Sequence, residues 1–263
     1  MSVQETSAWA PGSLAPQPGA APRARLWLTQ ARTELTLLLR NGEQVLLSLV
    51  LPLGLLVVLS SVDVIEVKRP GLAHVDFFTP GLFALAVMST AFTGQAIATG
   101  FERQYGVLKR LGATPLPRST LLLAKTTSVL VVEVLQLALL GGVAYALGWA
   151  PAGSFLTVLA FVLVGTAAFS GLGLLLGGTL RGLTCLAVAN LAWLLLVGLG
   201  GIVFDLDEFG SAESVVRLLP SAALAHGLRA SLVDGAFVGR DLLVLAVWAV
   251  GALVAASRAF RWE

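Results

Sequence analysis

Charge is scarce in this sequence. Asp, Glu, Lys and Arg make up only 12% of the 263 residues, whereas a soluble domain carries about 25%. The formal net charge is +2, which is too small to indicate a nucleic-acid partner. Cys185 is the only cysteine, and His74 and His226 are the only histidines. These counts exclude an intrachain disulfide and a metal site built from cysteine or histidine clusters.

Motifs for catalysis are also missing. The sequence contains no GxxxxGK(S/T) loop for ATP phosphates, no GxSxG and no HExxH. Neither ATP hydrolysis by this chain nor two common hydrolytic mechanisms therefore find support. We expect no catalytic residue, no metal and no cofactor bound by this chain. Residues 1–22 are rich in Pro, Ala and Gly and lack the apolar region of a signal peptide, which predicts a disordered cytoplasmic tail.

Apolar residues, by contrast, make up 57% of the chain, and mean hydropathy is +0.88. A membrane-spanning helix needs about 20 of them in a row. Six blocks are candidates, namely 44–62, about 77–99, about 120–148, about 154–178, about 183–204 and about 241–257. We therefore expect an all-α polytopic membrane protein, with its transmembrane domain over residues 41–263.

An amphipathic helix is predicted over residues 23–40, ahead of the first span. Five polar side chains fall at helical spacing on one face, namely Arg25, Thr29, Arg32, Thr36 and Arg40, opposite leucines and Trp27. Such a helix suits the headgroup region of a bilayer. The alternative is an ordinary helix packed on other protein, since amphipathicity alone does not separate the two.

The lysines and arginines predict the orientation. With six spans, the two termini and every second loop lie on the same side of the membrane. These segments hold twelve of the 17 basic residues, namely Arg23, Arg25, Arg32, Arg40, Arg103, Lys109, Arg110, Arg118, Lys125, Arg181, Arg258 and Arg261. The other segments hold five, namely Lys68, Arg69, Arg217, Arg229 and Arg240. Because positive charge concentrates on the cytoplasmic side, we expect six spans with both termini in the cytoplasm.

A short charged segment separates the second and third spans. Glu102, Arg103, Lys109 and Arg110 surround the apolar residues Tyr105, Val107, Leu108 and Leu111. Gly106 and Gly112 relax the backbone, and Pro115 and Pro117 end the helix before the third span. This pattern predicts a short cytoplasmic helix with an apolar ridge and a charged rim, which suits docking into the groove of another protein. A membrane-surface helix held by lipid headgroups fits the basic residues equally well.

Three further features lie in or near the spans. Glu133 is the only acid well inside one, with Gln136 on the same helical face, so it is either a transport group or a packing contact. Gly173 and Gly177 form a small-xxx-small pair for close helix packing. Before the last span, Pro220 breaks two short helical pieces that are too short to cross the bilayer. His226 and Arg229 lie in the second piece, as possible outer-gate residues or as interfacial polar residues.

Four segments of the sequence resemble the permease subunit of type-2 ABC transporters, the family of the daunorubicin-resistance-type drug exporters and polysaccharide exporters. They are RNGEQVLLSLVLPLGLL at 40–56, FFTPGLFALAVMSTAF at 77–92, ERQYGVLKRLGATPLPRSTLLLAK at 102–125 and LPSAALAHGLRASLVDG at 219–235. The third is the most specific. Gln104 and Lys109 stand where the family often has an acid, and Val107 stands where it often has Thr.

The resemblance implies a fold and a set of partners. It implies a permease dimer, identical or paralogous, in a bacterial plasma membrane, with six spans and a broken re-entrant outer helix pair. Residues 101–113 would form a coupling helix that docks on a separate ATP-binding subunit, which holds ATP and Mg. The cargo would be amphipathic or lipid-like. The residues alone leave a second hypothesis open, a proton- or ion-coupled carrier that uses Glu133.

Overall fold

The computed structural model describes residues 21–62, 71–202 and 210–260. The disordered tail predicted for residues 1–22 lies almost wholly outside them. The described residues form helices and no strands. In chain order these are α1 (Arg23–Arg40), α2 (Gly42–Ser61), α3 (His74–Met88), η1 (Ser89–Gly94), α4 (Gln95–Gln104), α5 (Val107–Gly112), α6 (Arg118–Ala146), α7 (Phe155–Thr179), α8 (Gly182–Leu199), α9 (Glu213–Val216), α10 (Pro220–Asp234) and α11 (Gly239–Ala259).

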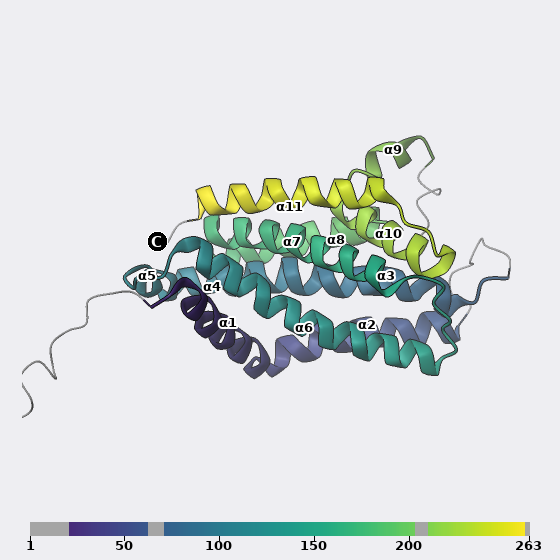
Figure 1. Cartoon of the computed structure of the whole chain (residues 1–263), viewed down its shortest axis with the longest axis horizontal. Coiled ribbons are helices and arrows are strands. Elements are labelled where there is room, and N and C mark those ends of the chain that lie inside the picture. Colours follow the sequence, from purple (N-terminus) through teal and green to yellow (C-terminus); the bar gives the residue numbers. More distant parts are fainter. Residues whose placement is uncertain (1–20, 63–70, 203–209, 261–263) are drawn as a thin grey trace, which may run out of the picture.

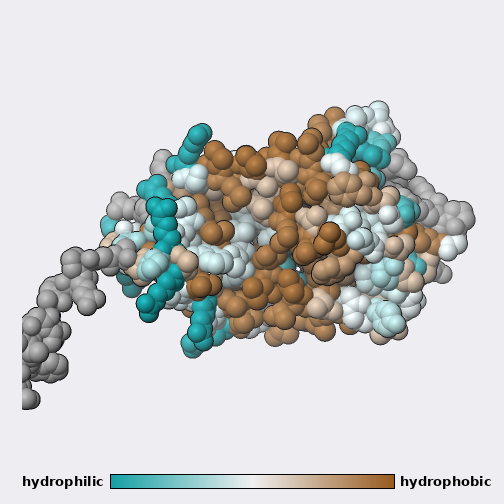
Figure 2. Space-filling model, in the orientation of Figure 1, coloured by the Kyte–Doolittle hydropathy of each residue, from teal (hydrophilic) through white to brown (hydrophobic). Residues whose placement is uncertain are grey.

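The long helices lie side by side along one axis (Figure 1). Five of the described helical stretches are long and apolar enough to cross a membrane. In α2, the described apolar stretch covers Ser48–Ser61, which is shorter. The face in Figure 2 carries a broad apolar band between two ends where hydrophilic side chains gather. This pattern fits a bilayer's hydrocarbon between two polar interfaces, and it confirms the predicted all-α polytopic membrane protein.

The second predicted span forms the centre of the bundle. Elements α3, η1 and α4 run without a break over His74–Gln104, and 89% of their most apolar window is buried inside the chain. For α8 the corresponding share is 17%, and for α11 it is 22%. The middle of this rod, STAFTG, is a π-helical turn, a rare conformation that occurs mainly at functional sites. The sequence analysis did not foresee it.

Glycines let α7 approach this rod closely. A Cβ atom on Gly173 would lie 2.7 Å from the Phe92 carbonyl oxygen, and one on Gly177 would lie 2.7 Å from the Ala96 carbonyl oxygen. No side chain fits at such distances, so both positions need glycine. The predicted small-xxx-small pair is therefore confirmed as a packing contact, and it joins α7 to η1 and α4 within the chain.

Candidate functional site at the α5 end of the bundle

The charged segment folds differently from the single helix over 101–113 that the resemblance implied. Helix α4 continues to Gln104, the chain turns at Tyr105 and Gly106, and only Val107–Gly112 form the separate helix α5. Gly106 adopts φ 71°, in the left-handed region that favours glycine. This turn is the physical reason for the break. Glu102 and Arg103 consequently belong to the end of the central rod.

Helix α5 has one anchored face and one open face. Leu108 is fully buried, in a cluster with Leu121, Leu122, Leu174, Ala256 and Phe260. Tyr105 is 66% exposed and Val107 38% exposed, and the side chains of Lys109 and Arg110 are exposed as well. Leu111 is partly buried against the same cluster. The arrangement thus holds α5 on α6, α7 and α11 and leaves an aromatic ring, an apolar side chain and two cations exposed. Helix α5 itself lies at one end of the bundle (Figure 1).

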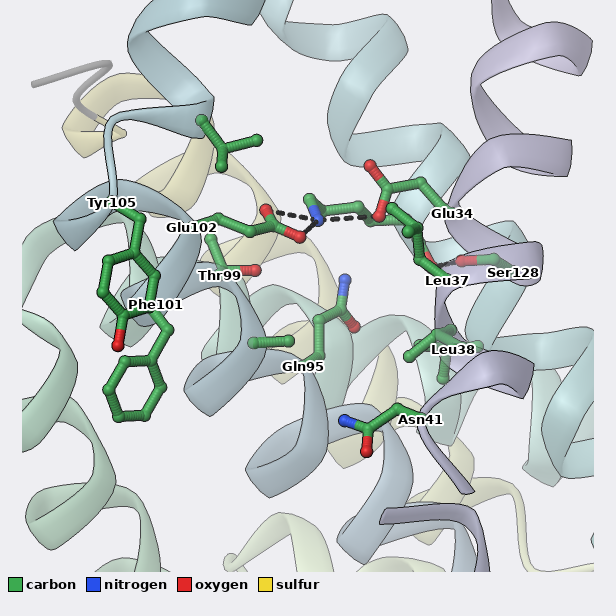
Figure 3. A pocket seen from close by; sticks show the side chains of 14 residues that line it. Glu34, Leu37, Leu38, Asn41, Gln95, Thr99, Phe101, Glu102, Tyr105 and Ser128 are labelled. Carbon is green, nitrogen blue, oxygen red and sulfur yellow. Dashed lines mark hydrogen bonds and ion pairs between the residues drawn. The ribbon is translucent and has the colours of Figure 1, made fainter. Parts of the chain in front are cut away.

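Three charged side chains, two of them buried and the third partly buried, lie directly behind this segment. Lys125 Nζ lies 2.8 Å from Glu34 Oε2 and 2.7 Å from Glu102 Oε2 (Figure 3). The Lys125 side chain is 4% exposed, Glu34 7% and Glu102 21%. We call these three residues the ion cluster. They come from α6, α1 and α4, so one ammonium group joins α1 and α6 to the end of the central rod.

The ion cluster carries two carboxylates for one cation. The Lys125 ammonium contacts both acids and is the cation that balances them. A buried charge that loses its partner is strongly destabilising. The cluster therefore depends on Lys125 more than on either carboxylate.

A cavity of about 280 Å³ with a mainly apolar wall adjoins the ion cluster. Gln95, Thr99 and Asn41 line it together with the three charged residues (Figure 3). Gln95 Oε1 accepts a hydrogen bond of 2.5 Å from Ser170. Gln95 Nε2 and Thr99 Oγ1 are buried and have no hydrogen-bond partner among the described residues. The cavity thus offers unused polar groups at the point where α1, α4 and α6 meet.

The structure separates the two polar residues predicted in the third span. Glu133 is fully buried and hydrogen-bonds Thr166 on α7. Gln136 turns toward the opposite side, where its Oε1 accepts from Thr90 at 2.9 Å and its Nε2 donates to Ser48 Oγ at 2.9 Å. Glu133 therefore joins two spans, whereas Gln136 supports the π-helical turn from behind.

A larger open cavity, which we call the η1 groove, lies beside that turn, and both partners of Gln136 line it. Its volume is about 460 Å³. Apolar side chains alternate in its wall with the polar residues Asn41, Ser48, Ser89, Thr90, Thr93, Asn190 and Trp193, which come mainly from α2, η1 and α8. Trp193 Nε1 donates to Ser89 Oγ at 3.0 Å. The groove is thus amphipathic and is bordered by two helices, α2 and α8, that leave much of their surface exposed.

The outer-gate candidates lie at the opposite end of the bundle and do not converge. Pro220 is the first residue of α10, and the first helical piece is only the four-residue α9. Arg229 is 1% exposed, donates to the carbonyls of Gly201 at 3.1 Å and Ile202 at 3.2 Å, and lies 4.4 Å from the centre of the Phe77 ring. His226 Nδ1 lies 2.5 Å from Asp241 Oδ2 on α11. Arg229 faces the interior, and His226 faces the last span.

The sequence analysis missed the ion cluster. It used Lys125 only as a positive charge for orientation, and it did not single out Glu34. One signal was present, because Glu34 lies three residues after Ala31, on the apolar side of an amphipathic helix. An acid on the side that packs against protein needs a partner. The partner itself is 91 residues away in the sequence, so local spacing does not identify it.

The family comparison agrees with this architecture. The sequence profile of the family "ABC-2 type transporter" matches residues 24–233, which is most of the chain. The matched region begins in α1 and ends in α10, so it includes the ion cluster, α5 and the η1 groove. No curated protein matches the chain.

Proposed function

The chain belongs to the ABC-2 type transporter family, and from this premise we propose that it is the permease subunit of an ATP-driven exporter. A separate subunit binds and hydrolyses ATP with Mg, and this chain binds neither. Two permease copies, identical or paralogous, form the working unit in a bacterial plasma membrane, with both termini in the cytoplasm. The sequence resembles the permeases of the daunorubicin-resistance-type drug exporters.

The observation that carries the proposal is the two-sided construction of α5. Its Leu108 is fully buried while Tyr105 and Val107 are exposed at the end of the bundle. An exposed aromatic and aliphatic pair with a basic rim is what a protein groove recognises. We therefore propose that Tyr105, Gly106, Val107, Arg110 and their neighbours contact the ATP-binding subunit.

The ion cluster provides a route from that contact into the membrane. Glu102 lies three residues before Tyr105, and its partner Lys125 also binds Glu34. Displacement of α5 would therefore act on the central rod, the third span and the interfacial helix together. ATP binding can drive transport through this route if it favours one arrangement of these helices over another.

The η1 groove supports an amphipathic or lipid-like cargo, such as a drug, a lipid or a lipid-linked glycan. Its wall mixes apolar and polar side chains, and residues of the π-helical turn form part of it. We propose that a second permease copy covers α2 and α8 and completes the translocation path between the protomers. Gln136 then positions the turn through Thr90 and Ser48.

An ion-coupled carrier that uses Glu133 is the alternative hypothesis, and the geometry does not favour it. A coupling carboxyl needs access to water or to the transport path. Glu133 is fully buried, contacts Thr166, and lines neither the cavity beside the ion cluster nor the η1 groove. Its place between α6 and α7 suits a packing contact.

The proposal is tested by capture of the partner. Tagged protein is purified from its native membrane in mild detergent, and co-purifying proteins are identified by mass spectrometry. We expect a stoichiometric ATP-binding subunit that is lost with Val107→Asp. Val215→Asp is the matched control, because Val215 is exposed on α9 at the other end of the bundle. Absence of an ATPase from the folded wild-type protein, or equal retention in both variants, would contradict the proposal.

A further inference from the structure

The cavity beside the ion cluster adjoins the η1 groove. Leu38 and Asn41, where α1 ends and α2 begins, line both of them. On its other side the cavity is lined by Tyr105 and Val107, which belong to the proposed contact with the ATP-binding subunit. The η1 groove continues to the π-helical turn. A ligand in the cavity would therefore lie between the docking surface and the proposed translocation path.

A column of polar side chains on α4 forms one wall of the cavity. Gln95, Thr99 and Glu102 follow one another at spacings of four and three residues, which places them on one face of the helix. In Figure 3, the amide nitrogen of Gln95 and the hydroxyl of Thr99 point into the space beside the Lys125–Glu102 pair. Both side chains are at least nine-tenths buried, and neither atom has a hydrogen-bond partner among the described residues. Because buried polar groups are normally paired, this column is suited to a polar ligand.

The rest of the wall is mainly apolar. Leu37 and Leu38 of α1 lie across the cavity from the polar column (Figure 3), and Val129 of α6 also lines it. Binding sites for small molecules commonly combine an apolar wall with a few polar groups that fix the orientation of the ligand. The cavity therefore suits an amphipathic molecule whose polar end lies along α4.

The charges of the two linings favour one kind of polar end. Lys125 is the only base among the described residues that line either the cavity or the η1 groove, and Glu34 and Glu102 are the only acids. Two carboxylates thus share one ammonium group. Attraction between charges is stronger in a partly buried site than in water, so a cationic ligand is favoured, whereas an anionic ligand finds no further base.

Glu102 is the acid that can accept a further hydrogen bond. Glu34 binds Lys125 through Oε2 and accepts from Gln30 Nε2 at 2.8 Å through Oε1. The Glu102 oxygens lie 2.8 and 2.7 Å from Lys125 Nζ, and no other described group donates to them. A carboxylate has about four acceptor sites, and Glu102 is the most exposed member of the ion cluster. A donor on a ligand can therefore bind Glu102 without displacing Lys125.

We propose that the cavity beside the ion cluster binds the protonated amino group of an amphipathic amine. The ammonium donates to Glu102 and Thr99, and the apolar part of the molecule extends past Leu38 and Asn41 toward the η1 groove. Gln95 lies one turn further from Glu102 and donates to an oxygen atom of the ligand. The inference rests on the proposed function in one respect, the identification of this ligand as the cargo, and it narrows the cargo to cationic amphipathic molecules.

The test measures binding to the full chain in nanodiscs, with no ATPase present. Labelled dodecylamine is bound to the protein, nanodiscs without protein give the background, and unlabelled dodecylamine, dodecanol or dodecanoate is added as the competitor. We expect the amine to compete roughly tenfold better than the alcohol, or more, because its hydrogen bond to Glu102 is between charged groups. The carboxylate should compete least. Glu102→Gln should abolish the preference for the amine over the alcohol, and Thr99→Val should lower it by about two- to tenfold.

Glu213→Gln is the matched control for the loss of an acid. Glu213 belongs to α9, at the other end of the bundle (Figure 1), and lines neither the cavity nor the η1 groove, so this variant should keep the preference for the amine. Equal competition by amine and alcohol in the wild type would overturn the proposal. An amine preference that survives Glu102→Gln, or that Glu213→Gln also removes, would overturn it as well.

The amine site and the exporter assignment can fail separately. The binding assay needs no ATPase, so a wild type without amine preference would leave the co-purification result standing. Conversely, an amine preference that depends on Glu102 would remain a binding site if no ATPase co-purified. If dodecylamine binds through Glu102 but leaves ATP hydrolysis by the assembled complex unchanged, the identification of the ligand as cargo is wrong.

Discussion

Lys125 Nζ and Glu102 Oε2 lie 2.7 Å apart, although 23 residues separate them in the sequence. This contact joins the third span to the last turn of the central rod, immediately before the turn at Gly106 that leads into α5. The same ammonium binds Glu34 on α1. A single buried cation thus connects the three elements that meet behind the proposed docking surface, and its removal has different consequences from the removal of either acid.

Lys125→Met should destabilise the protein strongly. It would leave the buried Glu34 and the partly buried Glu102 without their cation, and breaking a buried ion pair in this way costs about 3–5 kcal/mol. Thermal unfolding followed by tryptophan fluorescence in detergent measures the loss. Glu102→Gln is the informative comparison, because Lys125 keeps Glu34 and the amide oxygen still accepts a hydrogen bond. We expect about 1 kcal/mol for that change, and equal losses in the two variants would contradict a cluster centred on Lys125.

Glu102→Gln should nevertheless impair coupling. A neutral amide binds Lys125 less tightly than a carboxylate does. A movement of α5 would therefore displace α6 and α1 less than in the wild type. In proteoliposomes that contain the partner ATPase, we expect ATP hydrolysis to continue while transport per ATP falls. Glu34→Gln also leaves one acid on Lys125, but it spares the contact next to α5. Transport per ATP that falls equally in both variants would refute a specific role for Glu102.

The Gly106 turn can be tested with a matched glycine at the other end of the bundle. Gly106 and Gly148 adopt φ 71° and 94°, and a Cβ on either would meet nothing within 4 Å. Alanine at each position therefore introduces backbone strain of about 1–2 kcal/mol without a clash. We expect similar drops in thermal stability but reduced ATPase co-purification only for Gly106→Ala. Loss of the ATPase with Gly148→Ala as well would point to a general effect of instability.

The sequence predicted the membrane elements well because their signals are local. Alternating polar and apolar faces placed α1 at residues 23–40, which are the observed bounds, and apolar blocks located the long helices to within a few residues. The ion cluster could not be found in the same way, since its members are brought together only by the packing of α1 on α6. The π-helical turn carries no periodic signal, and the break at Gly106 was treated as a loosened backbone within one helix.

Glu133→Gln distinguishes the two classes of transporter. Gln keeps the size of the side chain and its ability to hydrogen-bond Thr166, so we expect transport to stay within about twofold of wild type if Glu133 only joins α6 and α7. A carrier that couples cargo to protons would lose transport, because the amide of Gln does not bind and release a proton at the pH of the assay. Transport assays at a fixed ATP concentration, with and without a proton gradient, provide the measurement. Loss of gradient-driven uptake would favour the carrier hypothesis.

Arg229 tests whether α10 contributes a gate or a structural strut. Its guanidinium binds the carbonyls of Gly201 and Ile202, just beyond the end of α8, and lies against Phe77 of α3. It therefore fastens α10 to the end of one span and to the start of another. Arg229→Met would take this donor from two buried carbonyls, at about 1–3 kcal/mol each, and thermal stability should fall accordingly. Arg240→Met is the control, because Arg240 is exposed and lies at the start of α11, the helix that follows α10. A gate residue would behave differently, since it would change the KM for cargo while stability stayed close to wild type. A changed KM with stability close to wild type would indicate that Arg229 contacts the cargo.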